Sequence, residues 1–311
     1  MDTILRSFQD GDEKSFLQLV NTAHSKLENL SMERVQQLTS SPRLNREGFF
    51  IVEQKGAPVG CVGVFTLPSQ RHLEIRYLAV IEAFSNLAII DQLIEAALEY
   101  SDFKQPELVK ATTPTIQPYL EAYQRFGFKP VRRMLRFGWD TTAIPREEPS
   151  HPIASIVEIS QDVVHEASQV YLDGLRPYWD WWVEEEGGDE AVVKDVADSM
   201  KSGNEVWLGA KVENKIVGVT GVLPNAERDE AWFWGVAVLP SFRMKGVGTA
   251  LMNSALDKTR ELGCKRLYLT TIGYLDSLTP AAILYLKSGG RIDAEYVHLI
   301  REPLKAQPAS Q

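Results

Sequence analysis

The chain has 311 residues, of which 44% are hydrophobic and 24% are charged. This composition is typical of an ordinary globular protein of about two domains, and it excludes disorder as the dominant state. The net charge of −9 argues against nucleic acid as a general partner, because such partners require a basic surface. No apolar run approaches the roughly 20 residues of a membrane-spanning helix, and the N-terminus lacks a signal-peptide pattern. We therefore expect no membrane partner and a cytoplasmic location.

The predicted elements follow the same order in both halves of the chain. Each half begins with a short strand, at 3–8 and at 153–159, and continues with two helical stretches. In the second half the later elements are strands at about 205–211, 215–223 and 230–239, a helix at 246–262, a strand at 266–271, a helix at 280–288 and a closing strand pair. This order indicates an α+β fold in which a mixed, mostly antiparallel central sheet is flanked by helices.

An internal repeat supports the division into halves. Val59-Gly60 and Val217-Gly218 lie 158 residues apart, and residues 79–84 map onto 237–242 with the same offset. Further along, the offset becomes 162, since Tyr123 maps onto Tyr285. We therefore predict two tandem domains of one type, an N-terminal domain at 1–145 and a C-terminal domain at 153–305. A proline-containing linker at 146–152 joins them.

The two cysteines, Cys61 and Cys264, have neither CxxC nor histidine spacing. We expect two buried thiols and predict neither a metal site nor a disulfide framework.

The most informative stretch runs from Val236 to Leu251, where a strand, a tight loop and a helix start follow one another. Gly246 and Gly248 lack side chains where a backbone would approach a ligand, and the first amides of a helix have no partners within the helix. A pyrophosphate fits such a place, and Arg243 and Lys245 add positive charge beside it. Taken alone, two glycines in this spacing are more typical of a glycine-relieved helix start than of a phosphate site.

The wider pattern, V-A-V-x-P-x-x-R-x-x-G-x-G-x-x-L, resembles the acyl-CoA-binding motif of the GCN5-related N-acetyltransferase (GNAT) superfamily. Residues 281–289 resemble the second helix motif of that family, A-x-x-L-Y-x-x-x-G-F, and place Tyr285 on its tyrosine. Gly290 replaces the usual phenylalanine, and Leu278 stands where asparagine is common. The tandem plan is similar to that of the mycothiol synthases, whose acceptor we do not carry over.

The resemblance implies that acetyl-CoA is the acyl donor, a co-substrate, with no metal involved. The backbone of the V-A-V strand would pair with pantetheine, and the amides of the following loop would hold the pyrophosphate. These donor-binding residues are Val236, Ala237, Val238, Arg243, Met244, Lys245, Gly246, Val247, Gly248 and Thr249. Tyr285 would lie near the sulfur and protonate the departing thiolate. The alternative for Tyr285 is an aromatic residue that only packs on the sheet.

The general base is less clear from the sequence. Relatives place a glutamate six residues before the second valine of the motif, where this chain has Trp232 and the first repeat has Glu74. Glu230 lies two residues earlier and on the same strand face, so it is the candidate base. Its alternative role is that of a solvated acid at the end of a strand.

The first repeat departs from the donor motif. Ser85 replaces Arg243, Ala88 replaces Gly246 and Ile90 replaces Gly248. These changes remove a positive charge and place a β-branched side chain where a phosphate would approach the backbone. We predict that the N-terminal domain binds CoA weakly or not at all and acts as a scaffold.

The expected acceptor side, residues 173–198, is strongly acidic, with nine acidic and two basic residues. It also contains Trp179, Trp181 and Glu184, which we predict to bind the acceptor, because aromatic faces and carboxylates suit a protonated amine. The alternative is an interdomain plug of buried tryptophans with a solvated acidic run.

Together these features predict an acyl-CoA-dependent N-acyltransferase that acetylates a primary amine of a small molecule or a peptide N-terminus, by direct attack in a ternary complex. The expected assembly is a monomer or a homodimer. The alternative is a non-catalytic acyl-CoA-binding or regulatory protein, because the strand glutamate is missing and the first repeat is degraded.

Overall fold

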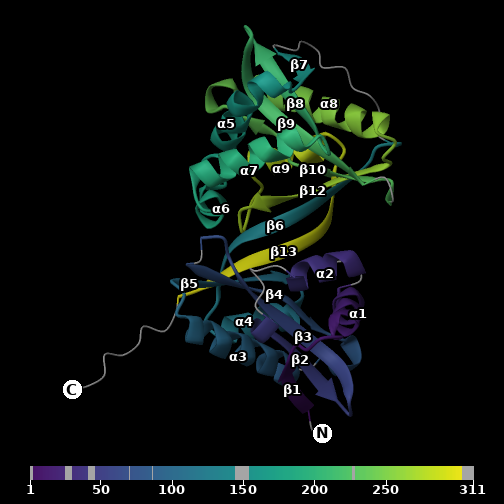
Figure 1. The fold of residues 1–311 in the computed structure, drawn as a ribbon, viewed down its shortest axis with the longest axis vertical. Coiled ribbons are helices and arrows are strands. Elements are labelled where there is room, and N and C mark those ends of the chain that lie inside the picture. The colour runs from purple at the N-terminus through teal and green to yellow at the C-terminus, as the bar shows by residue number, and fades with distance from the viewer. Residues whose placement is uncertain are drawn as a thin grey trace, which may run out of the picture. The chain divides into compact units, whose positions relative to one another are not determined.

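The structure is a computed structural model that describes residues 3–24, 30–40, 46–69, 71–85, 87–143, 154–225 and 228–302. It divides into two compact units (Figure 1). Unit 1 comprises Met1–Arg133 and Ala294–Gln311, and unit 2 comprises Met134–Asp293. The predicted linker at 146–152 lies outside the described residues.

The strands and helices of the first repeat follow the predicted order. Its elements are β1 (Thr3–Ser7), α1 (Glu13–Ala23), α2 (Met32–Ser40), β2 (Phe49–Gln54), β3 (Ala57–Thr66), β4 (His72–Val80), α3 (Leu87–Lys104), β5 (Leu108–Pro114), α4 (Gln117–Arg125) and β6 (Lys129–Asp140). Within unit 1 the strand order is β1-β2-β3-β4-β5-β13. Strands β4 and β5 are parallel, and the other neighbours are antiparallel.

The second repeat has the same plan with one extra helix, α6. Its elements are β7 (Ser155–Glu158), α5 (Val164–Leu175), α6 (Asp180–Glu185), α7 (Asp189–Ser202), β8 (Val206–Val212), β9 (Lys215–Asn225), β10 (Glu230–Phe233), β11 (Ala237–Val238), α8 (Val247–Glu261), β12 (Arg266–Gly273), α9 (Pro280–Lys287) and β13 (Arg291–Arg301). The sheet of unit 2 runs β7-β8-β9-β10-β12-β6, with β11 also on β9. The expected α+β class is confirmed in both units.

The repeat is visible in side-chain packing as well as in sequence. A Cβ added to Gly60 would approach Val80 and Leu93 to 3.1 Å each, and one added to Gly218 would approach Leu251 to 3.0 Å and Val238 to 3.3 Å. Each pair of equivalent residues is 158 positions apart. The close contact of β3 with β4 and α3 in the first repeat is therefore preserved in the second repeat as the contact of β9 with β11 and α8.

The last strand of each repeat belongs to the other repeat's unit. Residues 296–301 of β13 pair antiparallel with residues 109–114 of β5 in unit 1, and residues 134–140 of β6 lie in unit 2 beside β12. The expected closing strand pair after α9 is thus a single strand, β13, in the described residues. The contiguous division at 145 and 153 differs from these units for the same reason.

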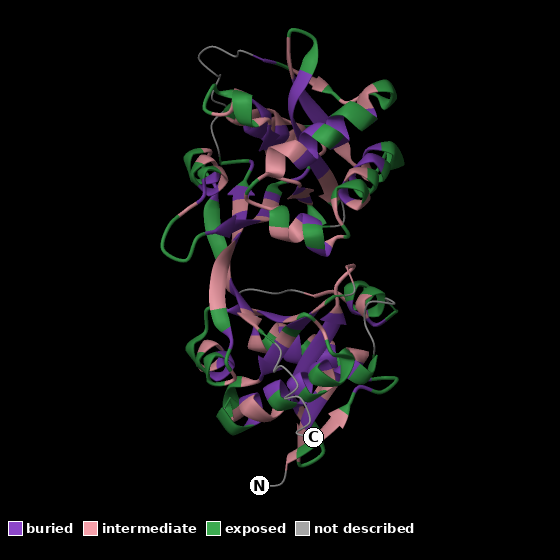
Figure 2. Ribbon diagram, turned by 90° about the vertical axis from the view of Figure 1, so that its left-hand side faces the viewer, coloured by how far each residue is buried: buried purple, intermediate pink, exposed green. Residues whose placement is uncertain are grey.

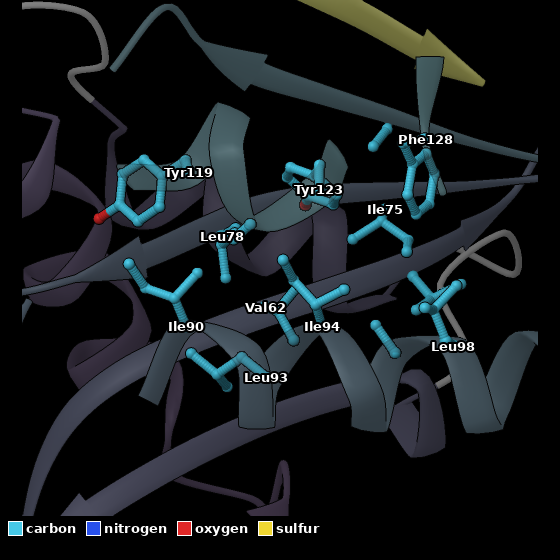
Figure 3. Packing of buried hydrophobic residues seen from close by; sticks show 14 of the residues in the cluster. Val62, Ile75, Leu78, Ile90, Leu93, Ile94, Leu98, Tyr119, Tyr123 and Phe128 are labelled. Atoms are coloured by element: carbon cyan, nitrogen blue, oxygen red, sulfur yellow. The ribbon is translucent and has the colours of Figure 1, made fainter. Parts of the chain in front are cut away.

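Buried residues are concentrated in the central strands of each unit, as Figure 2 shows in purple. In unit 1, strand residues such as Val62 and Ile75 pack on Ile90 and Ile94 of α3 and on Tyr123 of α4 (Figure 3). Both cysteines are buried free thiols, as expected.

Candidate active site

The motif strand of unit 2 is broken in the middle. The single strand expected at 230–239 is β10 and β11, separated by residues 234–236, which we call the strand break. Phe233 pairs with Val222 and Ala237 with Val219, so three residues oppose two on β9. Gly235 has φ +81°, a conformation that favours glycine. The break is therefore a β-bulge, which alternating hydrophobicity does not reveal.

Beyond the bulge, alternate backbone groups face away from β9. The Leu239 N–H donates to the Val217 carbonyl at 3.0 Å, so residues 237 and 239 use their polar groups within the sheet. By the antiparallel alternation, Val236 and Val238 present theirs on the opposite side. An added extended chain such as pantetheine pairs with groups of this kind.

The Tyr285 hydroxyl reaches the strand break. The Val236 N–H donates to the Tyr285 Oη at 3.0 Å. Tyr285 is buried, and burial raises its pKa to about 12, although the bond from Val236 acts in the opposite direction. The phenol is therefore protonated at neutral pH, as a proton donor must be.

Local sequence fixes Tyr285 on its short helix. The Thr279 Oγ1 accepts from the Ala282 N–H at 3.3 Å and caps α9, and Pro280 occupies the first helical position. Thr279 thus caps the helix although Leu278 occupies the place where the family often has asparagine. Leu278 itself packs against the apolar cluster around Tyr285.

Aromatic rings hold the Tyr285 ring in place. Phe137 and Trp139 of β6 lie 5.6 Å and 5.7 Å from it, and Phe233 lies 6.0 Å away, all measured between ring centroids. A Cβ on Gly290 would lie 2.6 Å from Trp139 Cε2. The missing phenylalanine at 290 is therefore explained, because the Trp139 indole takes that space. A strand of the first repeat supplies this ring.

The donor loop, residues 243–249, is shaped to receive an anion. Met244 and Gly246 have φ values of +58° and +82°, so left-handed residues flank Lys245, an arrangement typical of backbone nests that bind anions. Gly246 is the N-cap of α8 and makes no side-chain cap bond, so the first amides of α8 are available to a ligand.

Gly248 lets Leu284 and Val236 pack closely beside this loop. A Cβ placed on it would lie 3.2 Å from Leu284 Cδ2 and 3.6 Å from Val236 Cγ1. A larger side chain at 248 would therefore fill the space between α8, α9 and the strand break. Both glycines of the motif have distinct local roles, one in backbone conformation and one in close packing.

Arg243 is placed differently from the other residues of the donor loop. Its Nε donates to the Val238 carbonyl at 3.1 Å, and its Nη2 donates to the Gly174 and Arg176 carbonyls at 3.1 Å and 2.5 Å. The guanidinium also lies 5.7 Å from the Tyr178 ring centroid. The side chain therefore bonds to the end of α5, whereas Lys245 is exposed beside Phe242.

Two residues near the strand break were not predicted from the sequence. The Tyr171 Oη donates to the Trp234 carbonyl at 3.1 Å, and the Thr220 Oγ1 donates to the Gly235 carbonyl at 2.7 Å. These two hydroxyls donate to carbonyls that do not pair with the β9 backbone, because the bulge interrupts the strand pairing there. The glycine just before V-A-V was the available signal for an irregular strand at this position.

Glu230 is not brought near the strand break. It begins β10, six residues before Val236, a separation of about 15 to 20 Å along an extended strand. Its carboxylate lies 3.9 Å from the Arg266 guanidinium. Trp232, at the position of the family glutamate, packs edge-on against Tyr268 at 5.3 Å between centroids.

The predicted acceptor-side residues gather on one short element, which we call the aromatic segment (residues 178–182). The rings of Trp179 and Trp181 stack at 5.7 Å with an angle of 23°, and Trp182 meets Trp179 edge-on at 6.2 Å. The three tryptophans are half-buried, and Glu184 is exposed on α6. Aromatic faces and acidic groups are therefore neighbours here.

Comparison with known families agrees with this geometry. Residues 14–128 and 164–289 match the model of the acetyltransferase (GNAT) family. The chain belongs to this family. Both repeats are GNAT-type repeats, and the donor loop and Tyr285 lie in the second matched segment.

Individual relatives are distant. The chain is 31% identical over 113 residues to the uncharacterized N-acetyltransferase YjgM of Escherichia coli (strain K12), a match that covers 32% of this chain and spans 65% of that relative. A GCN5-related N-acetyltransferase structure from Sphaerobacter thermophilus matches with a TM-score of 0.74 at 17% identity, covering 98% of this chain and 97% of its own. A tandem GNAT protein from the clavulanic acid biosynthesis pathway matches with a TM-score of 0.66 at 14% identity, covering 98% and 100%.

The equivalent place in the GNAT repeat of unit 1 is filled. Ile90, which replaces Gly248, is fully buried and packs with Leu78 and Tyr119 (Figure 3). The Tyr119 hydroxyl accepts a hydrogen bond from the backbone N–H of Val80 in β4, at 3.0 Å. Tyr123, the equivalent of Tyr285, is buried and its hydroxyl finds no hydrogen-bond partner in the described part of the chain.

Two further findings bear on the site's surroundings. In the described ranges, no group of three His, Cys, Asp or Glu side chains is arranged to hold a metal ion. None of the helices in those ranges combines the length and apolar character needed to cross a bilayer.

Proposed function

We propose that this GNAT protein is an acyl-CoA-dependent N-acyltransferase whose active site lies in unit 2. Its proposed reaction is the transfer of acetyl from acetyl-CoA to a primary amine of a small molecule or a peptide N-terminus in a ternary complex. The observation that carries the proposal is the Tyr285 hydroxyl on the Val236 amide, next to the donor loop. An amide and a protonated phenol that lie this close can act on one thioester group.

The described residues fit acetyl-CoA as donor. The outward-facing Val236 carbonyl suits a pantetheine amide, whereas the Val238 carbonyl accepts from Arg243. The donor loop from Arg243 to Thr249 suits the pyrophosphate. Acetyl-CoA supplies the acetyl group as a thioester with a thiolate leaving group. In this proposal the backbone amides of the loop bind the phosphates, whereas the Arg243 side chain has another role.

The chain's own groups then have defined tasks. When the thioester binds, the Val236 N–H exchanges its bond to the Tyr285 oxygen for one to the thioester carbonyl, which it polarises while the neutral amine nitrogen attacks the carbonyl carbon. As the carbon–sulfur bond breaks, the Tyr285 hydroxyl gives its proton to the sulfur. An amine that arrives as an ammonium ion first loses one proton to water, because only the neutral nitrogen has a lone pair, and after attack the nitrogen loses a second proton to water. Glu230 is assigned neither step, since it begins β10 about 15 to 20 Å from Val236 along the strand.

The aromatic segment and its acidic neighbours are proposed to select a cationic amine. Trp179 and Trp181 offer stacked faces to an ammonium group, and Glu184 adds negative charge beside them. Acidic residues also raise the local concentration of cations. The substrate class that these residues suit is therefore an amine that arrives protonated.

The direct test measures thiol release from acetyl-CoA with a panel of primary amines. We expect amine-dependent release, and a matched tertiary amine provides the control because it has no N–H to lose. Release that is equal with the tertiary amine would indicate hydrolysis rather than transfer. Mass spectrometry of the acetylated amine identifies the product.

One observation favours a second candidate, a non-catalytic acyl-CoA-binding protein. Trp232 occupies the position of the family glutamate, and Glu230 is paired with Arg266 instead. Tight binding of acetyl-CoA with no turnover on any amine of the panel would support this second function and contradict the first.

A further inference from the structure

The end of α5 lies directly against the motif strand. A Cβ on Gly174 would lie 2.7 Å from the Val238 N and 2.8 Å from the Ala237 carbonyl carbon. Only glycine permits this approach without displacing backbone. The helix that leads into the aromatic segment is thus in contact with the strand that leads into the donor loop.

Arg243 bonds these two segments to each other. From the start of the donor loop, its guanidinium donates to Val238 on the strand and to the carbonyls of Gly174 and Arg176 at the end of α5. The last carbonyls of a helix lack partners within the helix and carry partial negative charge, so a cation stabilises them. The side chain is therefore a cap of α5 that originates in the donor loop.

The same side chain reaches the aromatic segment. Its guanidinium lies over the Tyr178 ring at 5.7 Å, and Trp179 and Trp181 follow directly. Arg176, whose carbonyl accepts from Arg243, also pairs through its own side chain with Asp180 and Asp189. One residue of the donor loop thus contacts the segment proposed to bind the acceptor.

We propose that Arg243 is a positioning residue that couples occupancy of the donor loop to the position and order of the aromatic segment. This inference rests on the proposed function, because it assigns the two segments to donor and acceptor. Binding of CoA at the loop stabilises the bonds to Gly174 and Arg176 and so orders residues 174–186. By thermodynamic linkage, order in that segment strengthens donor binding.

The test compares the wild-type chain with Arg243→Met, Arg243→Lys and Lys245→Met by hydrogen exchange of residues 174–186, with and without CoA. Lys245→Met is the matched control. It removes the same charge from the same loop, but the Lys245 ammonium lies over the Phe242 ring rather than on the end of α5. Arg243→Lys keeps the charge, but one ammonium group does not reproduce the fork that spans these carbonyls.

In the ligand-free protein we expect both Arg243 variants to exchange about tenfold faster over residues 174–186, with Lys245→Met unchanged. CoA should slow exchange there in the wild type and in Lys245→Met, but not in the Arg243 variants. Calorimetry at two salt concentrations should show a weaker salt dependence of CoA binding in Lys245→Met than in Arg243→Lys.

Unchanged exchange in both Arg243 variants would overturn the coupling. A CoA affinity at least tenfold weaker in Arg243→Met, with unchanged exchange, would instead make Arg243 a phosphate ligand. If wild-type CoA binding is absent, the proposed function fails, while the ligand-free exchange still decides whether Arg243 holds the end of α5.

Discussion

The two GNAT repeats share a backbone irregularity at one pair of equivalent positions but surround it differently. Tyr77 in β4 and Gly235 in the strand break both have positive φ, at +57° and +81°, and they lie 158 residues apart. Both repeats therefore keep the bulge. In unit 2 it presents the Val236 amide to Tyr285, whereas in unit 1 the carbonyl of Leu78, the residue equivalent to Val236, is held by His24 Nε2 at 2.9 Å.

The difference leads us to expect that the bulge alone does not make a donor site. Unit 1 retains the bulge, the helix and the tyrosine, but the buried Ile90 and Tyr119 pack where unit 2 has Gly248 in close contact with Leu284. A bulky side chain at the position of Gly248 would displace Leu284 beside the donor loop. Loss of CoA binding in the first repeat is thus expected from packing as much as from lost charge.

The largest expected effect comes from Trp139, which unit 2 receives from the strand of the first repeat. Trp139→Ala removes a buried ring beside Tyr285, Phe137 and Phe233, and we expect it to lower the free energy of unfolding by about 3 to 5 kcal/mol. Urea denaturation followed by tryptophan fluorescence measures this. The half-buried Trp232→Ala is the control and should cost less. A loss below about 1 kcal/mol for Trp139→Ala would contradict the assigned packing.

Tyr285→Phe separates the two tyrosines of the comparison. Removing the hydroxyl on Val236 should lower kcat about a hundredfold through loss of the acid, within the range of general acid catalysis. Steady-state thiol release measures this effect. Tyr123→Phe, the equivalent change in unit 1, should leave kcat unchanged, since its hydroxyl has no hydrogen-bond partner in the described residues. An unchanged kcat for Tyr285→Phe excludes the acid role.

Glu74 should make the stability of unit 1 depend on pH, which distinguishes it from unit 2, where Trp232 occupies the equivalent position. It is buried, which opposes its ionisation, but the Arg76 guanidinium at 2.6 Å and the Thr112 hydroxyl lower its pKa to about 2. Because the pKa is lower in the folded than in the unfolded state, the carboxylate stabilises unit 1 above pH 4.5. This contribution, about 3 kcal/mol, is lost as the pH falls from about 4.5 to 2.

Glu74→Gln should flatten this acid dependence, with the exposed Glu82→Gln as the control. All seven tryptophans lie in unit 2, so circular dichroism that changes without tryptophan fluorescence reports unit 1. A wild-type acid transition that Glu74→Gln leaves unaltered would show that Glu74 has no such role.

The smallest effect is expected from Glu230. Its distance from the strand break leads us to expect that Glu230→Gln changes kcat less than threefold and leaves the pH profile of kcat unchanged. Thiol release from pH 6 to 9 measures both. A loss near a hundredfold would instead restore Glu230 as the general base.

Much of this site follows from local sequence, and the rest depends on distant segments. The α8 and α9 helices were predicted to within one residue, since periodicity and capping residues are local signals. The exchange of β6 and β13 between the units was not predicted, because the local hydrophobic periodicity of a strand does not indicate which distant strand it pairs with. For the same reason Trp139 beside Gly290, and Arg243 at the end of α5, required the structure.

The central claim is that only unit 2 binds the acyl donor. Calorimetric titration of CoA into the full chain tests it directly, together with Gly248→Ile, which places the side chain of the first repeat in the second. We predict one CoA per chain for the wild type and at least thirtyfold weaker binding for Gly248→Ile. Two molecules per chain, or undiminished binding by Gly248→Ile, would contradict it.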